Sequence, residues 1–561
     1  MKRTLRPTYN VGVQEAKPDA ETLPEDDVRA CLRVLRAIEA DRSHLARLGQ
    51  KLHRELTMLA GLVAKPERHE VTRMAKAFRR AKREAAKEHD RKIIECAGLR
   101  IQRRSPVYTP LWLERPGPEE RRAEPEERRA EPEERRAEPE ERRAPPDLLD
   151  ARNCYVCKKP FTRMHRYYDS MCEECGEFNY AKREQSADLE GHYALVTGAR
   201  VKIGFQASLK LLRAGAHVIA TTRFPVDAAE RYAAEPDFAG FRARLQIHGI
   251  DLRHTPSVEL LARLLGERLP RLDYILNNAC QTVRRPDGFF KHLLAKENQA
   301  LAALPEALRA PLAEHVELRR AVQGAWPDGG ELVFPAGRPL SAPDDEARGP
   351  LIGATPRHGE GLLFSALLSQ RRYLDEDFRD GDALFPRGRY DEDRQQVDLR
   401  EVNSWRLRMH EVETPELLEV HLVNALAPFI LNARLKPLMA RTPGRHKHIV
   451  NVSAMEGQFY RAAKTDKHPH TNMAKAALNM MTRTSAADYV KDGIHMNAVD
   501  TGWVTDEDPA IHASRKAELG FAPPLDIIDG AARILDPIFA GHLNGAHVWG
   551  QFLKDYKPAP W

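Results

Sequence analysis

Short apolar runs alternate with helical patterns in the middle of the chain. Each run has the length of a strand and ends at polar or glycine residues. The runs are 193–196, 216–221, one that ends at 250–252, and 272–276. Helical patterns lie between them, near 228–232 and 257–268. Strands that alternate with helices predict an α/β domain with a doubly wound parallel sheet.

The N-terminal part of the chain, residues 1–110, has a different pattern. Over 25–63, apolar residues recur at steps of three and four, which predicts an amphipathic helix that ends near Gly61 and Pro66. A second, strongly basic helix is predicted over about 68–96. The two helices could pair as an antiparallel hairpin or form a coiled coil with another chain, and both interpretations remain open.

A charged repeat separates this region from the rest. The sequence Ala-Glu-Pro-Glu-Glu-Arg-Arg recurs over 117–146 with a period of seven residues. The repeat has no apolar seam, and its prolines prevent a continuous helix, so it is not a coiled coil. We therefore expect an extended, solvated linker over 111–149.

Length and charge bound the possible functions. A chain of 561 residues has room for several domains of about 100–200 residues each. The formal net charge of +6 is small for this size, and acidic residues dilute the basic helix, so nucleic acid is an unlikely partner. The chain shows no apolar run of membrane-spanning length and no secretory leader at its start, so we expect a cytoplasmic protein with no membrane association.

Four of the seven cysteines have the spacing of a metal site. Two Cys-x-x-Cys pairs, Cys154 with Cys157 and Cys172 with Cys175, lie within a small module at 150–180. This spacing is typical of a structural zinc ion held by four thiolates. A redox pair, or His165 in place of one sulfur, is the alternative. A zinc ion with four sulfur ligands has no open position, so we expect a brace or a surface for a protein partner rather than catalysis.

The first strand of the α/β region leads into a glycine-rich turn. Residues 193–204 combine a buried strand with Gly198 and Gly204, and a helical segment follows from Phe205. Such a turn lets a pyrophosphate approach the N-terminal amides of the helix. The stretch therefore predicts a dinucleotide site.

Several further motifs occur in an order that resembles the short-chain dehydrogenase/reductase family. They are Thr-Gly-x-x-x-x-x-Gly at 197–204, Asp251-Leu252, Asn277-Asn278-Ala279, Asn424 in Val-Asn-Ala-Leu-Ala-Pro-Phe, Ser453 in Ile-Val-Asn-Val-Ser, Lys475 in Ala-Lys-Ala-Ala-Leu-Asn, and Asn-Ala-Val-Asp-Thr-Gly-Trp-Val from Asn497. The resemblance covers about 190–280 and 415–550. It implies a Rossmann-like domain over 190–561 with a large insertion at about 281–410, which is either a lid or substrate subdomain or a surface loop.

The resemblance also implies which residues hold the cofactor. They are Gly198, Arg200, Lys202, Ile203, Gly204, Arg223, Asp251, Leu252, Asn278, Ala279, Lys475 and Thr505. Lys202 replaces the middle glycine of the family's turn. Arg223 follows the second strand, where an acidic residue would bind the ribose of NAD, and arginine suits a 2′-phosphate instead. We therefore expect NADP, with NAD possible.

The catalytic motif is incomplete. By resemblance, Ser453 holds the substrate oxygen, Lys475 positions the cofactor and Asn424 anchors a relay water. The position of the catalytic tyrosine, one helical turn before Lys475, is Thr471, which is a poor general acid. Tyr460 and His470 lie in the lengthened segment between Ser453 and Lys475 and are candidate substitutes.

These features predict an NADP-dependent oxidoreductase that acts on a carbonyl or alcohol whose identity the sequence does not reveal. The alternative is a catalytically impaired protein that senses NADP and uses the zinc module and helices as a scaffold for a protein partner. The family often forms dimers or tetramers, so self-association is also expected.

Overall fold

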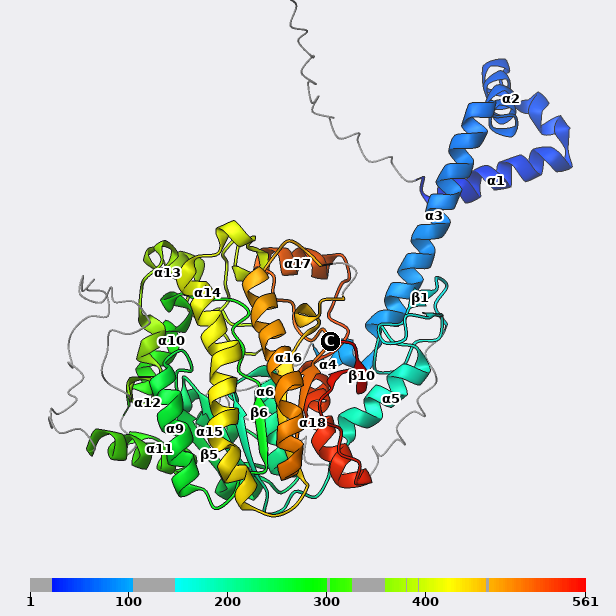
Figure 1. Ribbon diagram of the computed structural model, residues 1–561. Coiled ribbons are helices and arrows are strands. Elements are labelled where there is room, and N and C mark those ends of the chain that lie inside the picture. Colours follow the sequence, from blue (N-terminus) through cyan, green and yellow to red (C-terminus); the bar gives the residue numbers. More distant parts are fainter. Residues whose placement is uncertain are drawn as a thin grey trace, which may run out of the picture. The chain divides into compact units, whose positions relative to one another are not determined.

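The computed structural model describes residues 23–103, 147–299, 303–324, 359–379, 381–391, 393–460 and 464–561. The chain divides into two compact units, Met1–Ala85 and Ala86–Trp561 (Figure 1). Most of the charged linker predicted at 111–149 and the segment 325–358 of the insertion lie outside the described residues.

The first unit is helical and has no buried core among its described residues. Its elements are α1 (Glu25–Ala40), the 3-10 helix η1 (Arg42–Arg47), α2 (Gln50–Ala64) and the start of α3 (Arg68–Glu95). The prediction of one helix over 25–63 is wrong. Asp41 has an extended backbone and its side chain accepts a hydrogen bond from the Ser43 amide, so it ends α1 and caps the 3-10 turn. The basic helix predicted over 68–96 is confirmed.

The second unit is built on an eight-stranded sheet in the order β10-β9-β8-β7-β6-β3-β4-β5. All neighbouring strands are parallel except β9 and β10. The strands are β3 (Tyr193–Thr197), β4 (His217–Thr222), β5 (Leu245–Gly249), β6 (Tyr274–Asn277), β7 (Lys447–Ser453), β8 (Ile494–Asp500), β9 (Phe552–Lys554) and β10 (Lys557–Ala559). The predicted α/β class and its parallel sheet are confirmed.

Helices cover both faces of this sheet. The longer ones are α6 (Lys202–Arg213), α7 (Pro225–Ala233), α9 (Thr255–Arg268), α14 (Thr414–His421), α15 (Ala427–Arg441), α16 (Pro469–Tyr489), α17 (Ala510–Glu518) and α18 (Ile527–Asn544). Shorter elements are α4 (Gly98–Gln102), α8 (Phe238–Phe241), α12 (Glu360–Leu363), α13 (Gly381–Leu384), η4 (Arg242–Arg244), η7 (Leu367–Gln370), η8 (Asp375–Phe378), η9 (Ser404–Arg406), η10 (Met409–Glu411), the π-helical η11 (Leu422–Leu426), η12 (Met455–Gly457) and η13 (Val490–Asp492). One apolar core includes α6 and α18, and another includes α9 and α15 (Figure 1).

The insertion contributes to the core. Its helices α10 (Asp287–Glu297) and α11 (Glu306–Gly324) both bury apolar side chains. Leu308 and Leu312 of α11 belong to one core and Leu318 to the other. The described part of the insertion is therefore a packed subdomain rather than a surface loop.

The cysteine module is a small hairpin, β1 (Arg152–Asn153) with β2 (Pro160–Phe161), followed by α5 (Glu173–Glu184). Polar contacts attach it to α18 and the residue before it. Arg183 donates hydrogen bonds to Asp526 at 2.6 and 2.8 Å, and the Tyr168 hydroxyl donates to Asp529 at 2.5 Å. The module is thus joined to the sheet domain by buried charge pairs.

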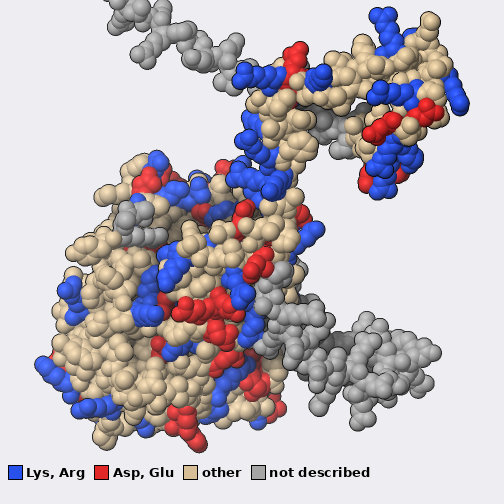
Figure 2. All heavy atoms as spheres, turned by 90° about the vertical axis from the view of Figure 1, so that its right-hand side faces the viewer, with Lys and Arg blue, Asp and Glu red and all other residues tan. Residues whose placement is uncertain are grey.

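The surface charge is mixed. On the face of the second unit seen in Figure 2, basic and acidic side chains are interspersed. None of the described helices is both long enough and apolar enough to span a bilayer.

Candidate functional site

A cavity of about 1270 Å³ opens at the carboxyl ends of the central parallel strands. This is the end of an open α/β sheet at which ligands bind. Most of the site residues predicted from the sequence line it: Gly198, Arg200, Lys202, Ile203, Gly204, Arg223, Asp251, Leu252, Asn278, Ala279, Ser453, Lys475 and Thr505. The predicted cofactor residues therefore share one cavity with Ser453 and Lys475.

The glycine turn between β3 and α6 depends on both of its glycines. Gly198 has a φ of +67°, and a Cβ there would lie 2.8 Å from the Cα of Ala279. A Cβ on Gly204 would overlap the Gly198 carbonyl and the Asn278 amide. Asn278 Nδ2 donates to the carbonyls of Thr197 and Gly198, at 3.0 and 3.2 Å. The turn is thereby held against the end of β6, with the N-terminus of α6 at the cavity.

Lys202 carries a positive charge beside this turn. Its backbone has a φ of +54°, and its Nζ lies 3.6 Å from Oε1 of Glu507. Burial alone would lower the pKa of Lys202, but Glu507 and Asp393 raise it above its ordinary value. Thr505 donates to the same Glu507 carboxylate at 2.8 Å. The lysine is therefore protonated, although its charge is shared with Glu507.

Arg200 also makes contacts within the protein. Its Nη1 lies 2.7 Å from Oδ2 of Asp227, and both side chains are buried. Arg231 contacts the same carboxylate oxygen at 2.8 Å. Arg200 is thus held in an internal charge cluster with Asp227 and Arg231 at the cavity wall.

Arg223 differs from Arg200 because none of the described carboxylates forms an ion pair with it, although Asp251 and Glu419 lie near enough to raise its pKa. Among the described residues, no Asp or Glu oxygen lies within ion-pairing distance of its guanidinium. The guanidinium lies over the rings of Phe290 and Phe224, 4.5 and 5.6 Å from their centroids. Burial, and then the nearby Arg253, lower the pKa of Arg223 to about 10, so it remains charged at neutral pH.

Asp251 follows β5 and is engaged within the protein. Nη2 of Arg253 donates to its Oδ2 at 2.6 Å, and Nε donates to its Oδ1 at 3.0 Å. Burial would raise the pKa of Asp251, but Arg253 holds it below its ordinary value. Arg253 also contacts Glu419 of α14. The Asp251 carboxylate, which was expected to contact the cofactor, is therefore already hydrogen-bonded to Arg253.

Ser453 and Lys475 both line the cavity. Ser453 is the last residue of β7, and Lys475 lies in the first half of α16. Both are buried, and Nζ of Lys475 donates to the Val452 carbonyl at 2.6 Å. The Ser453 hydroxyl has no hydrogen-bond partner among the described residues, so it is available to a bound oxygen atom.

Asn424 lies in the π-helical turn η11 and does not line the cavity. Its Oδ1 accepts from the Gln281 amide at 2.7 Å, and its Nδ2 donates to the Gln281 carbonyl at 3.1 Å. The side chain expected to anchor a water is therefore fully engaged with the start of the insertion.

The candidates to replace the missing tyrosine do not reach the cavity lining. Thr471 is buried and lies outside the lining, and Tyr460 is 86% exposed. His470 is buried with Nε2 3.4 Å from Oε1 of Glu416. The structure therefore supports none of these three as the group that faces a substrate.

Comparison with known proteins agrees with this geometry. The family described as short chain dehydrogenase matches residues 192–303, and the family described as enoyl-(acyl carrier protein) reductase matches residues 402–518. The R665 protein of Acanthamoeba polyphaga mimivirus is 30% identical over 416 residues, which are 72% of this chain and 74% of that protein. The chain belongs to the short-chain dehydrogenase/reductase family.

Other similar proteins cover less of the chain or resemble it less closely. The oxidoreductase YxbG of Bacillus subtilis is 30% identical over 116 residues, which are 20% of this chain and 39% of that protein. The solved structure of the Pseudomonas aeruginosa RhlG/NADP active-site complex is 17% identical, with a TM-score of 0.37 over 65% of this chain and 95% of that one.

Sequence reasoning gave no role to His468, which lines the cavity of this short-chain dehydrogenase together with Ser453 and Lys475. His468 precedes α16 with a φ of +40°, and its ring stacks on Trp405 at 3.9 Å with an interplanar angle of 5°. Burial lowers its pKa. Trp405 lies in the insertion, so no local pattern around His468 indicated this contact.

The cysteine module also reaches the dehydrogenase cavity. Tyr155 and Lys158, within and just after the first Cys-x-x-Cys pair, both line it. The Trp503 amide donates to the Tyr155 hydroxyl at 3.0 Å. The module therefore supports the loop after β8 that carries Thr505.

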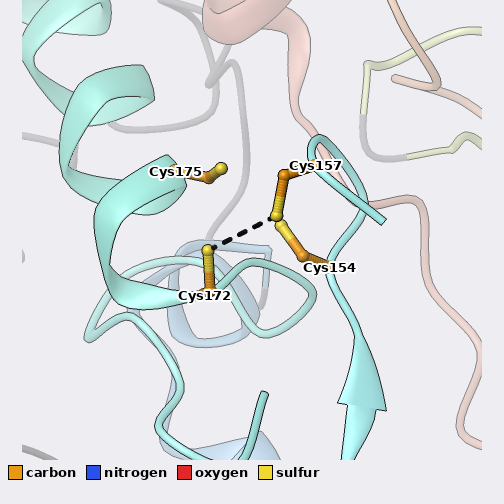
Figure 3. Close-up of side chains that lie close together, drawn as sticks. All are labelled: Cys154, Cys157, Cys172 and Cys175. Carbon is orange, nitrogen blue, oxygen red and sulfur yellow. Dashed lines mark hydrogen bonds between the residues drawn. The ribbon is translucent and has the colours of Figure 1, made fainter. Parts of the chain in front are cut away.

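The four cysteine side chains of the module point toward one another (Figure 3). Their sulfur atoms all lie within 4.8 Å of one another, and the sulfurs of Cys157 and Cys172 are 3.9 Å apart. A tetrahedral site with Zn–S bonds of about 2.3 Å separates its sulfurs by about 3.8 Å. The cluster therefore has the dimensions of a four-thiolate zinc site.

Proposed function

We propose that this protein is an NADP-dependent oxidoreductase that interconverts a carbonyl compound and its alcohol. The observation that carries this proposal is the Arg223 guanidinium, which has no ion-pair partner among the described residues and lines the same cavity as Ser453 and Lys475. Arginine binds phosphate through charge-assisted hydrogen bonds, and the end of the second strand is where the ribose 2′ position of a bound dinucleotide lies. The two glycines let the turn pack closely against Asn278 and Ala279, and the N-terminus of α6 that follows is suited to a pyrophosphate.

The residues of the chain have separate roles in the transfer of a hydride and a proton. When bound, the nicotinamide supplies or accepts a hydride at the substrate carbon. In reduction, the Ser453 hydroxyl donates a hydrogen bond to the carbonyl oxygen and stabilises the charge that develops there. Nζ of Lys475 donates to the carbonyl of Val452, the residue before this serine. A proton must then reach the oxygen, so that hydride and proton together convert the carbonyl to an alcohol.

We propose that His468 donates this proton to the substrate oxygen. It lines the cavity with Ser453 and Lys475, whereas Thr471, Tyr460 and His470 do not. Imidazole exchanges protons near neutral pH, unlike a threonine hydroxyl.

We also propose that Cys154, Cys157, Cys172 and Cys175 hold one structural zinc ion. The sulfur separations support this assignment. Four thiolates leave no coordination position for a substrate, so the ion acts by fixing the loop that carries Tyr155.

A turnover assay tests the oxidoreductase proposal. Purified protein is incubated with NADPH and a panel of aldehydes and ketones, and NADPH absorbance is followed. We expect NADPH consumption that depends on the carbonyl, with a loss of about 100-fold or more in Lys475→Ala, in the range seen when an acid–base group is removed. Lys491→Ala, on an exposed turn, is the matched control.

Binding of NADPH without consumption on any carbonyl, or of NADP without reduction on the corresponding alcohols, would contradict this function. That result would favour a nucleotide sensor instead.

A further inference from the structure

Three histidines gather at the opposite end of the sheet from the dehydrogenase cavity. His448 is the second residue of β7, His495 is the second residue of β8, and the two are paired in register. His547 comes from the loop between α18 and β9. One ring nitrogen from each lies within 4.8 Å of the other two.

The ring nitrogens are arranged as metal ligands are. Nε2 of His448 lies 3.0 Å from Nδ1 of His547. Nδ1 of His495 lies 3.2 Å from the Lys447 carbonyl, so it donates its hydrogen there and leaves the Nε2 lone pair free. A backbone carbonyl that orients an imidazole in this way is typical of histidines that bind metals.

A glycine makes this approach possible. A Cβ at Gly541 of α18 would overlap the ring of His547 and lie 3.2 Å from Nε2 of His448.

From this geometry we propose that His448, His495 and His547 form a second metal site, for a divalent transition ion such as zinc. Three imidazoles and one open position, filled by water, satisfy such an ion. The site is distinct from the four-cysteine cluster, and the proposal does not depend on the dehydrogenase activity.

Its position indicates a structural role. His448 and Ser453 are five residues apart on β7, or about 17 Å at the rise of a strand, so an ion at His448 cannot touch a substrate beside Ser453. The ion would instead link the starts of β7 and β8 to the loop before β9. Backbone contacts already join this loop to β8, since the Gly550 amide donates to the Met496 carbonyl at 2.8 Å.

Zinc content of the full chain tests the proposal. Wild-type protein and variants are equilibrated with excess zinc, passed through a desalting column and analysed for zinc per chain. We expect His547→Ala, His495→Ala and Gly541→Ala each to bind one ion fewer than wild type. Gly541→Ala keeps all three histidines but fills the space between the rings.

His192→Ala is the matched control, because His192 stacks on Tyr274 and touches none of the three rings. It should bind as much zinc as wild type. Cys157→Ser should lose a different ion, so the combined Cys157→Ser, His547→Ala variant should bind two fewer than wild type. Equal zinc content in wild type, His547→Ala and Gly541→Ala would overturn the proposal.

Discussion

Proton transfer is the step for which the chain lacks the family's usual residue. Thr471 occupies the position of the catalytic tyrosine and does not line the cavity. His468 lies three residues earlier, and its stacking on Trp405 holds the imidazole in the cavity wall. A single ring contact from the insertion therefore fixes a titratable group in the wall of the cavity that Ser453 also lines.

This assignment predicts a distinctive pH dependence. Burial holds the pKa of His468 below its ordinary value of 6.5. The protonated donor is therefore lost as pH rises through a value below 6.5, and kcat/KM for carbonyl reduction should fall over pH 5.5–8.5. His468→Asn, which tolerates the left-handed backbone, should lower kcat by about 100-fold and abolish this titration.

Tyr460→Phe provides the comparison, since Tyr460 is exposed and should retain the wild-type rate and pH profile. A wild-type profile in His468→Asn, together with loss of rate in Tyr460→Phe, would reverse the assignment.

The sequence identifies some of these residues and not others. Ser453 and Lys475 were predicted because short local motifs mark the end of a strand and the helix after it. His468 and Tyr155 had no such signal, because their positions depend on contacts with Trp405 and Trp503, which are distant in sequence. The ion pair of Arg200 with Asp227 had no local signal either, because Asp227 lies in a later helix, α7.

At the scale of elements, the cysteine module and the loop after β8 act together. Tyr155 lies between two proposed zinc ligands and accepts a hydrogen bond from the Trp503 amide at 3.0 Å. Gly502, which precedes Trp503, has a φ of +76°, and a Cβ on Gly502 would lie 3.1 Å from the Tyr155 hydroxyl. The loop geometry therefore depends on the position of the module.

Loss of the metal should consequently weaken nucleotide binding. Cys157→Ser should release zinc and lower NADPH affinity by about tenfold, which corresponds to about 1.4 kcal/mol, the scale of one hydrogen bond. Tyr155→Phe should retain zinc and show a similar loss of affinity. Zinc analysis and calorimetric titration measure the two effects separately, and unchanged NADPH affinity in a zinc-free Cys157→Ser protein would refute the coupling.

The elements themselves were largely predictable. Apolar runs of strand length indicated four strands of the parallel sheet, because strands buried on both faces are nearly continuous in hydrophobicity. The prediction of one helix over 25–63 was wrong because the Asp41 side chain accepts a hydrogen bond from a nearby backbone amide, which competes with the helix. The packing of α11 into both cores was not predictable, since its apolar residues fit a surface helix equally well.

At the scale of the whole second unit, three segments far apart in the chain enclose one cavity: the sheet ends, the insertion and the cysteine module. Each was recognised separately from its sequence. Their convergence was not, because residue patterns report which face of an element is buried but not which distant element covers it.

The central claim is that this cavity binds a nucleotide through a 2′-phosphate at Arg223. The most direct measurement is the dissociation constant of NADPH and of NADH for wild type, Arg223→Gln and the exposed control Arg263→Gln. We predict that wild type and Arg263→Gln prefer NADPH, and that Arg223→Gln loses about ten- to a hundredfold in NADPH affinity with little change for NADH. Failure of the wild-type protein to bind either nucleotide, or equal NADPH affinity in wild type and Arg223→Gln, would contradict the account.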